Sequence, residues 1–432
     1  MRRCSPIAVA ALTLTVVGCT QAAFGPSQTP GVTPSPSVSA SPTDPSAPLV
    51  ATPSSPSPST SLASTTPRAS RGVWEAAASM NRERSGFDAV LLGDGTVLAV
   101  GNDRDCTPGG AIEGSDTAEV YDPSADVWFD VEPLNKLRKI PATLNLLDGS
   151  AVVLGGINAD DFPFSSTKVF SPSTRRWSDG PLLGRAHGRP HAIRLDDGRI
   201  VVMSGDARPE SSEPIEIADA ALESWSVGGS VPATLSVIDV IALRGGRALV
   251  IAFSDVDVDG GPEAFIYDVD AGTWTSSTGG IRLAATVVAL PDGGALAIGG
   301  VGGGELWGDM RPVIPDVDRL DPETGRWTPV APMSTPRYGL QVAVLVDGRV
   351  LVAGGTATDG SRELALPSAE VYEPATDTWT PTGDLVEARY SGMIVPFADG
   401  SALILGGSAE YNVEGDVPFC PAPMISVERY RP

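Results

Sequence analysis

Basic side chains recur at one position of a sequence that repeats about every 50 residues. When the seven repeats are aligned on a Gly-Gly dipeptide or its replacement, the residue 17 places upstream is basic in six repeats and Leu235 in the other. The six basic residues are Arg84, Arg138, His187, Arg282, Arg337 and Arg389. Arginine can bind a carboxylate or phosphate through two parallel hydrogen bonds. The column therefore predicts either an anion-binding ring or ion pairs within repeats, with Glu119, Asp318, Glu370 and Glu428 as acidic partners.

Closely spaced carboxylates occur in the segment SDVDVDGGPE. Asp255, Asp257, Asp259 and Glu263, with a glycine at position 260, follow the order DxDxDGxxE. Carboxylates at alternate positions can surround a calcium ion where glycine allows a tight turn. The order resembles the calcium loops of integrin propellers, although those loops end in Asp. Calcium is thus the one cofactor that the sequence suggests, and a solvated acidic turn is the alternative.

Aromatic side chains stand out in segments where the repeats differ. Trp307, in GGGELWGDM, is the one tryptophan that breaks the repeat period, and Phe162, Phe164 and Tyr411 lie in corresponding segments of other repeats. An exposed aromatic ring can stack on a sugar or anchor a protein partner. Packing against the next repeat is the alternative for Trp307.

The elements that position these residues are predicted to be β-hairpins. Residues 337–355, RYGLQVAVLVDGRVLVAGG, form two alternating apolar runs joined at Asp347-Gly348, a typical hairpin signal. A second hairpin follows in each repeat and ends on a tryptophan. These tryptophans are Trp74, Trp128, Trp177, Trp225, Trp274, Trp327 and Trp379.

The combination of Gly-Gly, Tyr and Trp at this spacing resembles the kelch repeat. The resemblance covers nearly all of residues 72–432 and implies an all-β fold, a seven-bladed propeller of four-stranded blades around a channel. GVWEAAASM (72–80) matches a fourth strand and VERYRP (427–432) a third strand. We therefore expect the N-terminal strand near Trp74 to join the C-terminal strands and close the ring, which leaves no exposed sheet edge between the ends.

Ring closure also bears on two cysteines. Cys106 and Cys420 lie in corresponding long loops of the first and last repeats, which become neighbours in a closed ring. If the protein is exported, the setting permits a Cys106–Cys420 disulfide. No CxxC pattern or Cys/His cluster is present, so the sequence does not favour a zinc site.

The enzymatic alternative with the closest kelch precedent is galactose oxidase. That family holds copper with two histidines and two tyrosines, whereas this chain has only His187 and His191, about 13 Å apart in an extended strand. The missing ligands disfavour a copper enzyme. An epimerase or lyase acting on acidic sugars would suit the basic column and stays open as the carbohydrate-active alternative.

The N-terminal 71 residues predict export. Residues 1–19 have a basic start, an apolar run too short to span a membrane, and VVGC at the end, which together indicate a signal peptide. VVGC resembles a bacterial lipobox, which implies lipid modification of Cys19. Residues 20–71 are rich in Pro, Ser and Thr and predict an extended, disordered linker.

The sequence predicts a monomeric propeller outside the cytoplasm, anchored to the cell envelope by lipid or secreted. Its predicted function is non-catalytic binding of a protein or glycan. A net charge of −23 argues against nucleic acid as a partner, because phosphate binding requires a basic face. The membrane is expected to be contacted only through the lipid anchor.

Overall fold

The computed structural model describes residues 9–10, 13–14, 72–84, 86–101, 114–204, 212–254, 261–302, 312–358, 363–409 and 423–432. The described residues from 72 to 432 belong to one compact unit. The boundaries expected for the signal peptide and the linker stay predictions. No helix among the described residues is both long and apolar enough to cross a membrane.

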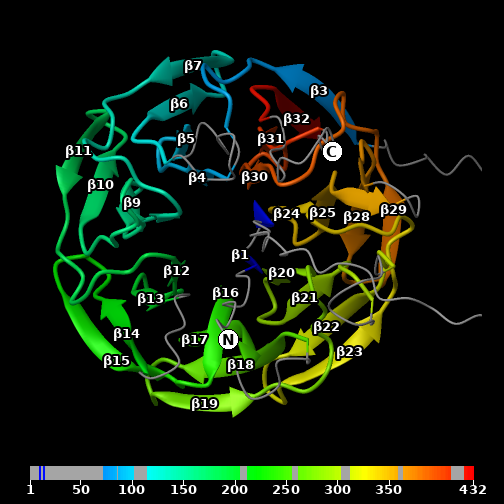
Figure 1. Cartoon of the computed structure of the whole chain (residues 1–432). Coiled ribbons are helices and arrows are strands. Elements are labelled where there is room, and N and C mark those ends of the chain that lie inside the picture. The colour runs from blue at the N-terminus through cyan, green and yellow to red at the C-terminus, as the bar shows by residue number, and fades with distance from the viewer. Residues whose placement is uncertain are drawn as a thin grey trace, which may run out of the picture. The chain divides into compact units, whose positions relative to one another are not determined.

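Seven four-stranded antiparallel sheets form a ring of blades around a central axis (Figure 1). The first strand of each blade lines the centre. In blades 1 to 7 these first strands are β4 (Asp88–Leu91), β8 (Ala142–Asn145), β12 (Pro190–Arg194), β16 (Leu235–Leu243), β20 (Thr286–Ala289), β24 (Gln341–Val344) and β30 (Met393–Pro396).

The second and third strands form the middle of each blade. The second strands are β5 (Val97–Val100), β9 (Ala151–Leu154), β13 (Ile200–Ser204), β17 (Arg247–Ser254), β21 (Ala295–Ile298), β25 (Val350–Ala353) and β31 (Ala402–Leu405). The third strands are β6 (Ala118–Asp122), β10 (Thr167–Ser171), β14 (Glu213–Ala218), β18 (Glu263–Asp268), β22 (Val317–Asp321), β28 (Ala369–Glu373) and β32 (Val427–Arg431).

The fourth strands form the rim. They are β7 (Val127–Asp130), β11 (Arg176–Asp179), β15 (Trp225–Val231), β19 (Thr273–Ser276), β23 (Arg326–Val330), β29 (Thr378–Pro381) and β3 (Val73–Ala77). Two short hairpins stand outside the blades, formed by β1 (Val9–Ala10) with β2 (Thr13–Leu14) and by β26 (Thr356–Thr358) with β27 (Glu363–Ala365).

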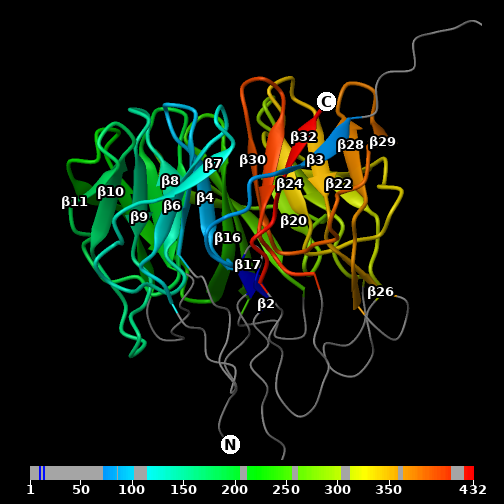
Figure 2. The same ribbon diagram turned by 90° about the horizontal axis from the view of Figure 1, so that it is seen from above.

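The predicted closure is confirmed. β3 pairs with β32 from Val73↔Arg431 to Ala77↔Val427, so blade 7 is built from both ends of the described ring. The strands run between two faces (Figure 2). We call the face where the first strands begin and the second strands end the loop face, and the opposite face, which carries the Asp-Gly turns, the turn face.

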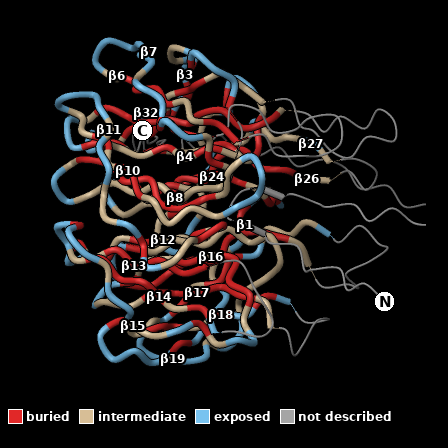
Figure 3. Tube along the Cα trace, turned by 60° about the vertical axis from the view of Figure 1, so that its left-hand side comes forward, coloured by how far each residue is buried: buried red, intermediate tan, exposed pale blue. Residues whose placement is uncertain are grey.

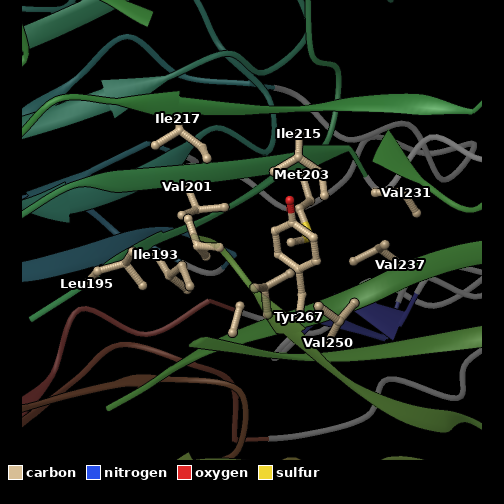
Figure 4. Packing of buried hydrophobic residues seen from close by; sticks show 13 residues of the cluster. Ile193, Leu195, Val201, Met203, Ile215, Ile217, Val231, Val237, Val250 and Tyr267 are labelled. Carbon is tan, nitrogen blue, oxygen red and sulfur yellow. The ribbon is translucent and has the colours of Figure 1, made fainter. Parts of the chain in front are cut away.

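Apolar side chains pack between blades more than within them. The described residues form seven buried clusters, each with members from two neighbouring blades. Figure 4 shows the cluster between blades 3 and 4, where Tyr267 packs against Met203 and Ile215. The second strands are almost wholly buried while turns and rim strands are exposed (Figure 3). A second strand faces a neighbour on both sides, and this explains its unbroken apolar run.

The repeating tryptophan fastens one blade to the previous blade. The indole Nε1 of Trp128 donates to the Ala78 carbonyl at 2.8 Å, and Trp379 donates to Ala331 at 2.8 Å. Trp177, Trp225 and Trp274 make the same kind of bond. Each acceptor lies in or just after the fourth strand of the preceding blade, so the tryptophan period reflects contacts between blades.

Candidate functional site

The basic column lies just before the first strands on the loop face, and five of its six basic members are buried, whereas Arg282 is half-buried. Arg84, Arg138, Arg337, Arg389 and His187 are each 0% exposed. Burial of this kind keeps the charged groups away from solvent and from any ligand that approaches from outside. It also requires acceptors around each charge, because an uncompensated buried charge is costly.

The constant spacing of 17 residues has a direct structural cause. Arg337 Nη1 donates to the Gly354 carbonyl at 2.7 Å, and Arg389 Nη1 donates to the Gly406 carbonyl at 3.0 Å. Arg84, Arg138 and Arg282 donate to the corresponding carbonyls of Gly101, Gly155 and Gly299. These glycines have positive φ angles, a conformation that glycine adopts without strain.

The predicted ion pairs within repeats are confirmed. Arg84 pairs with Glu119 at 2.8 Å, Arg337 with Glu370 at 3.0 Å and Arg389 with Glu428 at 2.6 Å. Arg282 pairs with Asp318 in the same arrangement. Each pair joins the segment just before the first strand to the third strand of the same blade.

The carboxylates also hold the loop that enters each blade. Glu370 accepts hydrogen bonds from the backbone N–H groups of Ser334 and Thr335 at 2.8 and 3.2 Å. Glu428 does the same for Val386 and Glu387 at 2.6 and 3.0 Å. Burial lowers the pKa of Arg337 and Arg389, and the neighbouring glutamates partly offset this. These polar groups therefore form the internal framework of the blade.

Blades 3 and 4 replace the pair in two different ways. In blade 3, His187 Nε2 lies 2.9 Å from Glu216, which also accepts backbone hydrogen bonds from Gly184 and Arg185. In blade 4, Leu235 takes the basic position and Phe265 the acidic position, as the strand register shows. Both charges are absent together in this blade.

Blade 2 keeps the arginine but not the acid. Lys168 takes the acidic position, and it pairs with Asp179 at 2.6 Å instead. Arg138 is surrounded by the Gly155 and Ser166 carbonyls and by the Ser166 hydroxyl, at 2.6, 3.1 and 2.7 Å. Burial without a carboxylate lowers the pKa of Arg138 to about 10, so the group is still charged at neutral pH.

A braced loop in the same blade presents an aromatic ring. The Asn158 side chain accepts hydrogen bonds from the N–H groups of Asp160 and Phe162, both at 2.9 Å. Phe162 is 68% exposed, whereas the ring of Phe164 lies 4.6 Å from the guanidinium of Arg138. The loop thus holds Phe164 inward and Phe162 outward.

A second set of polar residues lies at one level of the first strands. Asp88, His191 and Asp239 each pair with the residue just before the Gly-Gly position. Burial raises the pKa of Asp88 to about 6, although hydrogen bonds with Thr143 of blade 2 act in the opposite direction. Burial also raises the pKa of Asp239 to about 7. Burial, together with the charge of Arg189, lowers the pKa of His191 to about 4.

Several predicted site residues lie outside the described residues. They are Cys19, Cys106, Cys420, Asp255, Asp257, Asp259, Trp307 and Tyr411. The lipid anchor, the disulfide and the calcium loop therefore stay predictions, and of the calcium ligands only Glu263 is placed, at the start of β18. Among the described residues, no group of three or more His, Cys, Asp or Glu side chains could hold a metal ion.

Sequence reasoning missed the His187–Glu216 pair and the level formed by Asp88, His191 and Asp239. Alignment of the third strands would have found Glu216, because it occupies the position of Glu119 and Glu370. Asp88 and Asp239 carry no such signal in the sequence, because the first strands of the other blades have different residues at this level.

Blade 4 suggests a test of the buried pair. Glu370→Phe alone should lower the free energy of unfolding by about 3–5 kcal/mol, because it leaves Arg337 buried without its carboxylate. Adding Arg337→Leu reproduces the residues of blade 4 and should recover part of that loss. Urea unfolding of both single variants and the double variant should give a coupling energy of about 1–3 kcal/mol. Simple additivity would show that the two side chains do not depend on each other.

The raised pKa of Asp239, in β16, predicts that the stability of the fold depends on pH. The pKa of Asp239 is higher in the folded chain than its ordinary value of 3.8, so its ionisation between about pH 4 and 7 weakens the fold. Asp239→Asn keeps an acceptor for the Val240 N–H, which Asp239 binds at 2.8 Å. The variant should be more stable by about 1 kcal/mol or more at pH 8 and gain nothing near pH 4.

Urea unfolding at both pH values checks this prediction, with the exposed Asp196→Asn as the control. An equal effect of Asp239→Asn at pH 4 and pH 8 would contradict it.

Comparison with known proteins identifies one of the seven repeats. The family described as Kelch motif matches residues 338–385. An F-box/kelch-repeat protein of Arabidopsis thaliana is 46% identical over 71 residues, which is 16% of this chain and 18% of that protein. Kelch-like protein terF of Aspergillus terreus is 35% identical over 102 residues, 23% of this chain and 22% of that protein. The aligned stretches thus span about a fifth of these relatives' lengths.

A solved structure extends the likeness to most of the ring. A fungal alcohol oxidase of the AA5 family, in complex with copper, superposes with a TM-score of 0.62 and 17% identity, over 84% of this chain and 76% of that chain. At this identity the likeness concerns the fold alone. The motif match identifies residues 338–385 as a kelch repeat, and the kelch-repeat relatives and the seven blades fit further repeats of this kind.

Proposed function

We propose that this protein is a non-catalytic binding module, exported and anchored to the cell envelope, which recognises a protein or a glycan through its loop face. The observation that carries the proposal is the loop Asn158–Phe162, where the backbone is braced by Asn158 and Phe162 is held 68% exposed. An aromatic ring fixed in advance loses little conformational freedom on binding and suits a contact hot spot.

The basic column supports this division of roles. Its buried members are engaged by glutamates and by glycine carbonyls of their own blades. These contacts build the scaffold and leave recognition to the loops that differ between blades, which is common for propellers and other rigid scaffolds. Export and anchoring rest on the signal-like residues 1–19 and the linker composition.

The two histidines have partners of their own. His187 pairs with Glu216, and His191 is hydrogen-bonded to the backbone of Val237 in blade 4. These contacts assign both imidazoles to the packing of blades 3 and 4. We therefore favour binding over the copper chemistry named for the structurally similar oxidase.

Selection from a random peptide library and binding to a glycan array test the proposal without a known partner. Ligands found with the unaltered protein should bind Phe162→Ser at least about tenfold more weakly, because a central aromatic anchor contributes more than 1 kcal/mol. Val227→Ser, at a residue that is 70% exposed on rim strand β15, should bind as before. Equal binding by both variants would contradict a role for the blade 2 loop.

A further inference from the structure

Basic residues are concentrated in one sector of an acidic chain. From residue 134 to 195, which covers blade 2 and the first strand of blade 3, there are nine Lys and Arg against four Asp and Glu, although the whole chain carries −23. All three lysines of the protein, Lys136, Lys139 and Lys168, belong to blade 2 and the segment that enters it. The charge is therefore not spread evenly around the ring.

Part of this charge lies beside the ring of Phe164, two residues after the exposed Phe162, which itself follows the exposed acids Asp160 and Asp161. Lys136 is exposed and lies 5.7 Å from the ring of Phe164, with Arg138 on the same ring at 4.6 Å. Lys139 bonds Asp161, next to Phe162, at 2.9 Å. Within the described part of the chain, neither Lys136 nor Arg138 forms an ion pair with an acid.

The buried Arg138 adds to the positive electrostatic potential under the loop that carries Phe164. In four other blades a carboxylate on the third strand neutralises the equivalent arginine, whereas in blade 2 that position is Lys168. The substitution adds a positive charge and removes a negative one. Asp179 compensates Lys168, so the charge of Arg138 is balanced only by carbonyl and hydroxyl dipoles.

From this arrangement we infer that the loop face of blade 2 binds an acidic peptide segment that also carries an apolar side chain. The inference rests on the proposed function and names the partner chemistry. Acidic groups would complement the exposed Lys136, while the apolar side chain would cover Phe162. Because the chain is otherwise strongly acidic, repulsion elsewhere would direct such a segment to this sector. The exposed phenyl ring favours a peptide over an acidic sugar, whose surface is more polar.

Fluorescence anisotropy with a labelled peptide of alternating Glu and Phe tests this inference on the full chain. The peptide should bind, more weakly at higher salt, and a Lys/Phe peptide of equal length should not. Lys136→Glu should weaken binding at least about fivefold at low salt, and Phe162→Ser at least about tenfold. Arg176→Glu makes the same charge change at an exposed residue of the same blade on the turn face and should stay within about twofold.

The outcomes separate this inference from the proposed function. Equal losses for Lys136→Glu and Arg176→Glu would mean that only total charge matters and would overturn the local site. Oligogalacturonate binding that depends on Phe162, without binding of the Glu/Phe peptide, would overturn the peptide class but keep a recognition role for the loop face. If neither the Glu/Phe peptide nor oligogalacturonate binds, the inference is wrong. The proposed function is then tested separately by the ligands found with the peptide library and the glycan array. Circular dichroism of each variant verifies that it is folded.

Discussion

A guanidinium group that is cut off from water must be surrounded by acceptors, and this requirement organises the blades. Arg337 meets it with the Gly354 carbonyl from the end of the second strand and with Glu370 from the third strand. The same carboxylate then binds the loop that enters the blade. One ion pair thus connects the end of the second strand, the third strand and the segment that enters the blade, and its recurrence in four blades gives the scaffold its regularity.

Contacts between blades complete the ring. Tryptophan indoles reach the preceding blade, and seven apolar clusters fill the spaces between neighbouring sheets. The pairing of β3 with β32, from Val73↔Arg431 to Ala77↔Val427, builds blade 7 from both ends of the described ring, so this blade depends on contacts between residues far apart in sequence. Closure therefore couples the N-terminal strand to the stability of the final blade.

The fold was readable from the sequence because its determinants are local and repeated. The tryptophan recurs in all seven repeats, the Asp-Gly turn in six and the Gly-Gly dipeptide in four, and the match of residues 72–80 to a fourth strand predicted closure. The pairs of Arg337 and Arg389 were predictable for the same reason. The state of Asp239 was not, because its pKa depends on burial by neighbouring blades and not on any local pattern. The exposure of Phe162 likewise depends on how Asn158 braces one loop, which no repeat specifies.

The basic column is scaffold, and we propose that recognition lies where the blades differ. Nuclear magnetic resonance of protein labelled with ¹⁵N in arginine tests it most directly, with Arg337→Lys and Arg389→Lys used to assign the signals. We expect the guanidinium protons of Arg337 and Arg389 to exchange slowly with water and their signals not to shift when sulfate or a dicarboxylate is added. Saturable shifts of these signals on addition of either anion would contradict it and make the column a binding ring.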